Sequence, residues 1–373
     1  MSKLQNTNIL DDISRIGKID KSNMLSFCVN APKHYETAAK IAKKFSISYS
    51  KPQKIIVAGM GGSAISGELL KDWARDKLPI PIEVEREYAL PAYADKNTLI
   101  FVVSYSGETE ETLSVFLDAV KRGCMIVCIS SGGKLVEFAQ KLSVPYVRIP
   151  SGIPPRAALP YLFMPLLTVL EKIGLVSDVN MEVSEAVKTL RKVSSENSPE
   201  KSSKVNFSKT LALNINGTVP VVYGFGFYRA VAQRFKQQFN ENSKVPSKWE
   251  FLPELNHNEI VGWEKAQKMT KNFSAIFIRD MEEPKEIRQR IEATKELMLK
   301  EKVKVFEVWS MGKSKLAKML STICIGDFTS VYLALLRKVD PTPVKTIAIL
   351  KEKMKQSGVK EKILRELQKL VEK

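Results

Sequence analysis

The sequence predicts an α/β protein with two tandem domains, each a doubly wound parallel sheet with flanking helices. Short apolar runs alternate with helical patterns along the first half, which is typical of βαβ units. The same pattern starts again after a polar, serine-rich stretch at 194–204. The 373 residues, 44% of them hydrophobic, are enough for two cores of ordinary size. We therefore expect one domain at 1–193, with an N-terminal helical segment and connecting helices, and another at 205–373.

Apolar runs predict five strands in the first domain, at residues 54–60, 80–86, 98–104, 124–130 and 144–150. A helix is expected from Glu110 to a stop at Gly123, and a long, mostly buried helix at 156–174. Cys124 and Cys128 lie in the fourth run. We interpret them as core thiols, with a redox or metal role as the alternative.

The second domain repeats the plan of the first. Residues 219–239 have the order strand, glycine turn and helix, and strands are expected at 274–280 and 303–310 with a helix at 286–300 between them. This order indicates an internal duplication of an α/β unit. In such folds the site lies between the halves, at the carboxyl ends of the strands.

Charge and composition narrow the function classes. The net charge of +17 favours anionic partners, but the lysines are spread over solvated helix faces without a recognition motif, so we expect no nucleic acid partner. No apolar run reaches the roughly 18 residues of a membrane span, and residues 1–14 lack the order of a secretory signal, so we expect a cytoplasmic protein without membrane contact. With only His34 and His257 as histidines, no metal site is expected.

Two polar turns follow successive strands of the first domain. Gly59, Gly61 and Ala64 fit a dinucleotide turn, for which Glu85 could hold the ribose. The next strand, however, leads into "SYSGETEET" at 104–112, where hydroxyl groups surround a glycine. Free backbone N–H groups, a positive helix end and short hydroxyl donors suit an anion of phosphate size. Although Ser and Thr also cap helices, the two turns together favour a sugar phosphate over NAD.

Five segments carry a resemblance to a known family. In order, "GMGGSAISGELL", "SYSGETEETL", "PPRAALPYLF", "NENSK" and "ELNHNEIVGWE" resemble the bifunctional phosphoglucose/phosphomannose isomerases, which have two sugar-isomerase (SIS) domains. The resemblance runs from about residue 20 to residue 355 and implies two tandem SIS domains. It also implies a homodimeric enzyme of carbohydrate metabolism (glycolysis and gluconeogenesis) that needs no metal or redox cofactor.

The resemblance implies a role for each matching residue. Arg156 would lie beside the reacting carbons, Glu241 would be the base, and His257 would open the sugar ring, lent across a dimer interface. The phosphate of the substrate would be bound by Gly61, Gly62, Ser63, Ser104, Ser106 and Thr109. Glu108 departs from the Asn or Asp that is frequent in this family. A carboxylate there is unfavourable for phosphate binding unless its side chain points away.

The family also has a C-terminal lysine that assists ring opening, and helical periodicity selects it here. A helix after Pro343 would have an apolar stripe that includes Ile347 and Met354. At 100° per residue Lys351 falls inside that stripe, whereas Lys345 and Lys353 fall outside. A lysine on a buried face is unusual. The purely structural explanation is snorkelling, in which the aliphatic stem is buried and the ammonium group reaches solvent. Beside the resemblance, we assign Lys351 to ring opening.

The function implied is the interconversion of glucose 6-phosphate and mannose 6-phosphate with fructose 6-phosphate through an enediolate. A non-catalytic sugar-phosphate sensor would keep the serine turns but have no use for Glu241, His257 and Lys351. An amino-sugar phosphate isomerase stays open as a further alternative.

The C-terminal segment at 357–373 extends past the resemblance. Its apolar residues recur at helical spacing opposite a mixed charged face, which predicts an amphipathic helix. Mixed charges and the lack of an aromatic anchor argue against a membrane surface. We expect the helix to pack on its own domain or on a dimer partner and to contribute stability.

Overall fold

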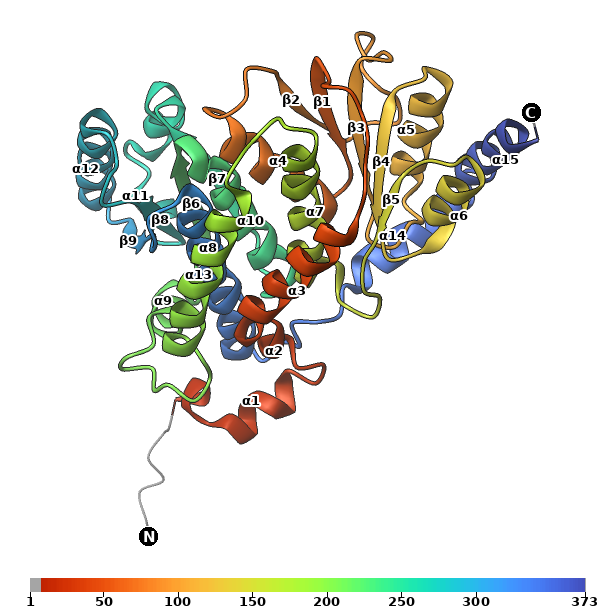
Figure 1. The fold of residues 1–373 in the computed structure, drawn as a ribbon. Helices are drawn as coiled ribbons and strands as arrows, with labels where there is room; N and C mark the ends of the chain where they lie inside the picture. The colour runs from red at the N-terminus through yellow and green to blue at the C-terminus, as the bar shows by residue number, and fades with distance from the viewer. Residues whose placement is uncertain (1–7, 373) are drawn as a thin grey trace. The chain divides into compact units, whose positions relative to one another are not determined.

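A computed structural model describes residues 8–372 of the chain as an α/β protein with two compact units (Figure 1). Unit 1 comprises residues 1–32 and 184–343, and unit 2 comprises residues 33–183 and 344–373. These units differ from the predicted domains 1–193 and 205–373, because each includes a segment from both parts of the chain. Residues 1–7, part of the stretch without a secretory pattern, lie outside the described residues.

Unit 2 contains a parallel sheet of order β2-β1-β3-β4-β5. Its strands are β1 (Lys54–Ala58), β2 (Ile82–Glu85), β3 (Thr98–Val103), β4 (Met125–Ser130) and β5 (Tyr146–Arg148). All five strand predictions are confirmed. Strands buried on both faces form continuous apolar runs, and β3 is buried along its whole length.

Helices cover both faces of this sheet, as a doubly wound fold requires. In Figure 1, α4 (Gly62–Ala74) and α7 (Leu159–Lys172) lie on one side of the strands. The other side carries α5 (Glu110–Lys121), α6 (Gly133–Lys141) and the C-terminal α15 (Val359–Val371). The remaining helices of this unit are α3 (Ala31–Lys44), which begins at the unit boundary, and α14 (Lys345–Lys355).

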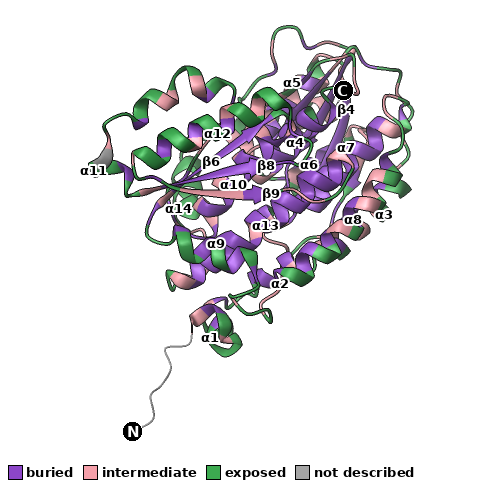
Figure 2. Ribbon diagram, turned by 90° about the vertical axis from the view of Figure 1, so that its left-hand side faces the viewer, coloured by how far each residue is buried: buried purple, intermediate pink, exposed green. Residues whose placement is uncertain are grey.

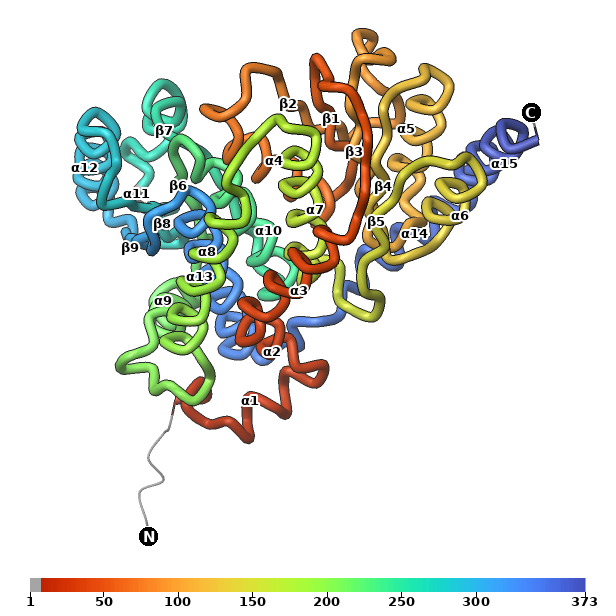
Figure 3. Tube along the Cα trace, viewed as in Figure 1, coloured from red at the N-terminus to blue at the C-terminus, as the bar shows by residue number. Residues whose placement is uncertain are grey.

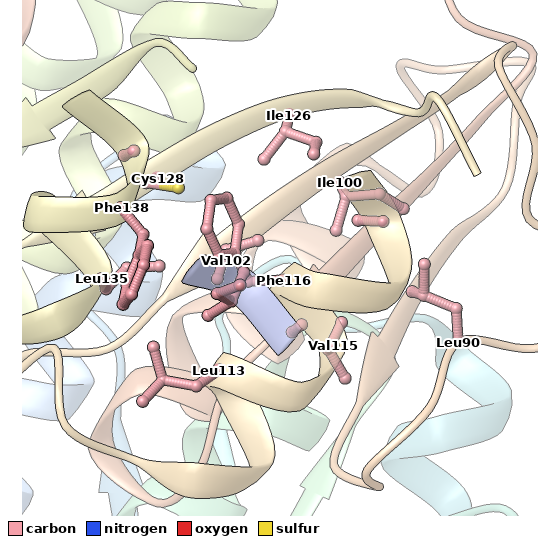
Figure 4. Close-up of a cluster of buried hydrophobic side chains, with 14 of the residues drawn as sticks. Leu90, Ile100, Val102, Leu113, Val115, Phe116, Ile126, Cys128, Leu135 and Phe138 are labelled. Carbon is pink, nitrogen blue, oxygen red and sulfur yellow. The ribbon is translucent and has the colours of Figure 1, made fainter. Parts of the chain in front are cut away.

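The core between the sheet and α5, α6 and α15 is built from aliphatic and aromatic side chains (Figure 4). Phe116 and Cys128 are fully buried there, and Cys124 packs against the cluster. The prediction of a core thiol is therefore confirmed for Cys128, whereas Cys124 is partly buried at the edge of the core. Ile363 and Leu367 of α15 complete the same core.

Unit 1 contains a second parallel sheet, of order β7-β6-β8-β9. Its strands are β6 (Val219–Phe225), β7 (Lys248–Leu252), β8 (Phe273–Arg279) and β9 (Lys304–Trp309). Three of them match the predictions, whereas the sequence pattern does not predict β7. As an edge strand, β7 alternates charged and aromatic residues and has no continuous apolar run.

The helices of unit 1 pack around this sheet. They include α1 (Ile13–Ile19), α2 (Met24–Val29), α9 (Phe207–Ile215), α10 (Arg229–Glu241), α11 (Gln267–Thr270), α12 (Lys285–Lys300) and α13 (Lys315–Leu336), with α8 (Val179–Glu196) beginning in unit 2. Figure 2 shows the buried colour on β6, β8 and α13, while α12 is largely exposed. Helix α13 is long and apolar enough to cross a membrane by length and composition, but 89% of its apolar window is buried inside the fold. Its apolarity is therefore explained by its position in the core.

The polar stretch at 194–204 is not a linker between the units. Ser194 and Asn197 are buried, the Asn197 carboxamide accepts from the Ser208 amide, and the Asn197 carbonyl accepts from the Tyr332 hydroxyl at 2.7 Å. Asn197 thereby satisfies polar groups of both α9 and α13. The polarity of Ser194 and Asn197 thus serves buried hydrogen bonds, whereas Glu196, Lys201 and Lys204 are exposed.

The C-terminal segment forms the predicted amphipathic helix, and it packs on its own chain (Figure 3). Helix α15 contacts α5 and α6 of unit 2, although its place in the sequence predicts that it belongs to the C-terminal domain. The expectation of a buried apolar stripe on α14 is wrong for this chain, since α14 has no buried residue. Ile347 and Met354 are exposed, and Lys351 is exposed beside them.

Candidate active site

The first turn connects β1 to α4 at the carboxyl edge of the unit 2 sheet. Gly61 has a positive φ of 51° and precedes the helix as its N-cap, without a side chain to accept from the first N–H groups. The Ser63 and Ala64 amides donate to the Met60 carbonyl, at 2.9 and 3.4 Å, so this turn offers an anion chiefly the positive end of α4. Ser63, in the first turn of α4, is buried.

The second turn connects β3 to α5 at the neighbouring position of the same edge. The Ser104 hydroxyl accepts from the Gly107 amide at 3.1 Å and donates to the Thr109 hydroxyl at 3.0 Å. The Ser106 hydroxyl accepts from the Glu108 amide at 3.2 Å. Thr109 is the N-cap of α5 but makes no capping bond with its side chain. The turn thus has a defined shape, with its hydroxyl groups gathered at a helix N-terminus.

Tyr105 brings the first and second turns together. Its backbone amide donates to the Ser63 hydroxyl at 3.4 Å, across 42 positions of sequence. Its carbonyl accepts from the amide and hydroxyl of Ser131, in the turn after β4, at 3.0 and 2.7 Å. Three consecutive turns of one sheet edge are therefore linked through one residue.

Arg156 lies on a fourth segment at this edge. It is 3% exposed and belongs to the short 3-10 helix Pro155–Ala157. A Cβ added at Gly62 would lie 3.2 Å from the Pro155 carbonyl oxygen, so the first turn passes directly against this segment. The Tyr105 hydroxyl donates to the Pro150 carbonyl and accepts from the Ile153 amide, at 3.2 and 2.8 Å. The structure thus groups the serine turns with the segment that carries Arg156.

Glu108 points away from the hydroxyl groups of the second turn. One carboxylate oxygen accepts from the Lys134 amide at 2.9 Å, and the other pairs with the Lys360 ammonium group. Helix α6 has Gly132 as N-cap and therefore lacks a capping side chain of its own. Glu108 supplies that cap from the neighbouring turn. The departure from Asn or Asp at this position thus places no carboxylate among the phosphate-binding candidates.

Glu241 and His257 belong to unit 1. Glu241 is the last residue of α10, and the turn after it is fixed by Asn242 and Ser243, which bond to Ser330 of α13 at 2.9 and 2.6 Å. His257 is exposed at the end of the 3-10 helix Glu254–His257. Its neighbours anchor the segment, since Asn256 donates to Thr294 at 2.8 Å and Glu259 accepts from Tyr223 at 2.6 Å.

The carboxyl edge of the unit 1 sheet is filled by the protein's own charges. The Tyr228 hydroxyl donates to Asp280 and contacts Ser310, each at 2.7 Å, and the Lys318 ammonium group lies 3.0 Å from Asp280. Burial raises the pKa of Asp280, but hydrogen bonds from the Glu282 amide, Tyr228 and Lys318 outweigh burial and lower that pKa. An ionised carboxylate at this edge disfavours an anionic ligand, whereas the Glu108 carboxylate is turned away from the hydroxyl groups of the unit 2 edge.

The sequence predicts the hydroxyl groups at the carboxyl edge of the unit 2 sheet, but it does not predict the role of Tyr105. The signal available was its place inside "SYSGETEET", between two of the selected serines. Within residues 8–372, no group of three or more His, Cys, Asp or Glu side chains could hold a metal ion.

Two family descriptions match the chain. Residues 48–151 match the SIS domain, and residues 204–354 match the bacterial phospho-glucose isomerase C-terminal SIS domain. The chain is also similar in fold to a hypothetical protein from Thermus thermophilus, with a TM-score of 0.72, 14% identity, and coverage of 92% of this chain and 94% of that one.

Sequence comparison gives the nearer relationship. A bifunctional phosphoglucose/phosphomannose isomerase of Caldicellulosiruptor bescii is 42% identical over 334 residues, which cover 89% of this chain and 98% of the relative. The enzyme of that name from Aquifex aeolicus is 36% identical over 303 residues, or 81% of this chain and 90% of the relative. With both SIS domains matched and nearly the full length of the first relative covered, this chain belongs to the bifunctional phosphoglucose/phosphomannose isomerase family.

Proposed function

We propose that this protein interconverts glucose 6-phosphate and mannose 6-phosphate with fructose 6-phosphate. The observation that carries the proposal is the grouping of Ser63, the second turn and the Arg156 segment at one sheet edge, in a member of this isomerase family. The hydroxyls of Ser63, Ser104, Ser106 and Thr109, with the backbone of Gly61 and Gly62, would bind the phosphate. The N-termini of α4 and α5 add their positive ends to this site.

The proposed chemistry is a proton transfer between two neighbouring carbons. His257 and Lys351 assist opening of the sugar ring, at the ring oxygen and hydroxyl. For Lys351 the support is the family resemblance alone, because the apolar stripe that selected it is exposed. Glu241 then removes the proton from carbon 2 of the open aldose, which gives an enediolate, and returns it to carbon 1 to form the ketose. Arg156 offsets the negative charge of the enediolate. The same route with the opposite face of carbon 2 connects mannose 6-phosphate.

We further propose a homodimer in the cytoplasm. The family resemblance supports a dimer in which His257 serves the partner's site, and the exposed position of His257 is compatible with this. A hexose phosphate is strongly charged and does not cross a bilayer unaided, which supports a location beside glycolysis and gluconeogenesis.

A coupled assay on the purified chain tests the proposal. The three hexose phosphates should each be interconverted, while glucosamine 6-phosphate tests the amino-sugar alternative.

Glu241→Gln should keep the fold and phosphate binding and lower kcat by at least about 10²-fold, because the variant lacks the general base. The matched control is Glu296→Gln, since Glu296 is exposed on α12 and pairs there with Lys300.

The alternatives give different results. Substrate binding without turnover by the unaltered chain would identify a sensor, and turnover of glucosamine 6-phosphate alone would identify an amino-sugar enzyme. Near-normal kcat in Glu241→Gln would remove Glu241 from the mechanism.

A further inference from the structure

We propose that Lys360, on the C-terminal helix, is a positioning residue for the phosphate site, acting through Glu108. The inference rests on the proposed function and extends it to a segment that lies beyond the family resemblance. It assigns α15 a part in substrate affinity, in addition to the stability expected of an amphipathic helix.

Glu108 joins three parts of unit 2. Its backbone amide donates to the Ser106 hydroxyl, and Thr109 follows it as the N-cap of α5. Its side chain bonds the Lys134 amide at the start of α6 and pairs with Lys360 on α15. The Glu108 side chain therefore ties the backbone between two of the phosphate-binding candidates, Ser106 and Thr109, to α6 and α15.

The turn that contains Glu108 is also in close contact with the start of α6 through Gly107. Gly107 has a positive φ of 67°, and a Cβ there would lie only 1.9 Å from the Gly132 carbonyl oxygen. The Gly107 carbonyl accepts from the Leu135 amide at 3.0 Å. The second turn is thus packed against the start of α6, and the Glu108 side chain closes the remaining side.

Lys360 is held in place by the packing of its helix. Two turns of α15 beyond Lys360 are anchored in the core, with Ile363 6% and Leu367 0% exposed. A second ion pair, between Glu366 and Lys121 of α5, lies at 3.4 Å. Because α15 contacts both α5 and α6, its packing fixes the position of Lys360 beside Glu108.

The effect of the pair should be on binding, and it should be moderate. The side chains of Lys360 and Glu108 are 28% and 43% exposed, which weakens their attraction through solvent screening. Lys360→Gln should raise the KM for glucose 6-phosphate, and the dissociation constant of inorganic phosphate, by about two- to five-fold. The kcat should not change, because no reacting atom is touched.

Two classes of variant test this with isothermal titration of inorganic phosphate and steady-state kinetics. Lys360→Gln and Glu108→Gln each remove the ion pair, and Lys360→Arg keeps it. The matched control is Lys369→Gln, which removes a lysine of the same helix whose partner is Glu366. Positioning predicts weaker phosphate binding in both Gln variants, normal binding in the Arg variant and the control, and no further loss in the Lys360→Gln/Glu108→Gln double variant.

A simple electrostatic effect predicts a different pattern. If Lys360 acted only as a distant positive charge, removal of the Glu108 charge would tighten phosphate binding, and the double variant would lie between the singles. That result, or unchanged phosphate binding in Lys360→Gln, would overturn the inference. Absence of isomerase activity in the unaltered chain would contradict the proposed function instead, while the phosphate titrations would still decide the positioning role.

Discussion

At the scale of single residues, Tyr105 shows how much of the site depends on one side chain. Its hydroxyl is bonded to Pro150 and Ile153, and its backbone to Ser63 and Ser131. The sequence identifies the hydroxyls of Ser104, Ser106 and Thr109 because residue type alone suggests phosphate. It does not identify Tyr105, because its partners lie 26 to 48 positions away.

Tyr105→Phe should disturb the segment that carries Arg156. The Ile153 amide loses its acceptor, so the free energy of unfolding should fall by about 1 kcal/mol. If Arg156 stabilises the enediolate, kcat should fall several-fold with little change in phosphate affinity. Tyr49→Phe is the matched control, since the Tyr49 hydroxyl bonds the carbonyl and amide of Ile126 on β4. Equal kcat in the two variants would show that the hydroxyl of Tyr105 has only a structural role.

His34 provides a prediction about pH. Its Nδ1 lies 2.9 Å from the Tyr161 hydroxyl, and burial, with Lys33 nearby, lowers the pKa of His34. In the unfolded chain the His pKa is about 6.5, so on acidification the unfolded chain binds a proton at a higher pH than the folded chain does. The neutral His34 therefore contributes its full stability above the unfolded pKa of about 6.5. This contribution is lost as the pH falls from there through the lower pKa of the folded chain.

Urea unfolding between about pH 5 and pH 8 checks this expectation. The unaltered chain should lose more stability on acidification than His34→Gln, whose side chain does not titrate. Each sequence is compared with itself at the upper pH, which removes the loss of the Tyr161 contact from the comparison. A parallel decline in both proteins would mean that the environment of His34 does not disfavour its charged form.

At the scale of secondary-structure elements, the sequence identifies what is local. Strands β1, β3 and β4 of unit 2 are predictable because each is a continuous apolar run, and β2 because Ile82 and Val84 alternate with glutamates. Edge strand β7 is missed because its charged residues alternate with aromatic ones and no aliphatic side chain precedes Leu252. Helix α15 is recognised by its period. The period of an apolar stripe does not predict which part of the structure packs against it. The stripe of α14 is exposed, whereas that of α15 is buried against helices some 250 positions earlier, as the Lys360–Glu108 pair illustrates.

Helix α15 should contribute measurably to the stability of unit 2. Leu367→Ala removes a fully buried side chain from the core shared with α5 and α6, so the free energy of unfolding should fall by about 2 kcal/mol or more. Leu299→Ala on α12, where the side chain is 57% exposed, should change it by less than about 0.5 kcal/mol. Similar unfolding midpoints for both variants would show that α15 is not part of the cooperative unit. Point substitution is preferable to truncation, because truncation after Gln356 also removes Lys360.

At the scale of the whole molecule, the division into units is the least predictable feature. Residues 1–32 and 184–343 form one unit because buried contacts join distant segments, for example Lys209, which is 0% exposed and bonds Asp11 and the Pro199 carbonyl. Composition suggests a boundary at 194–204, but this stretch lies within unit 1, where Ser194 and Asn197 are buried. Glu241 and His257 belong to unit 1, whereas the serine turns, Arg156 and Lys351 belong to unit 2.

The proposed dimer can be tested through the two unit 1 residues. Glu241→Gln and His257→Ala chains should each be inactive. If His257 serves the partner's site, a mixed dimer has one site with both functional residues and one with neither. After subunit exchange of equal amounts, half of the dimers are mixed, so the activity should return to about a quarter of that of the unaltered enzyme. Exchange is verified separately with differently tagged chains, and each variant alone is the control. Verified exchange without recovered activity would mean that His257 acts within its own chain, because only then does every site of a mixed dimer lack one residue.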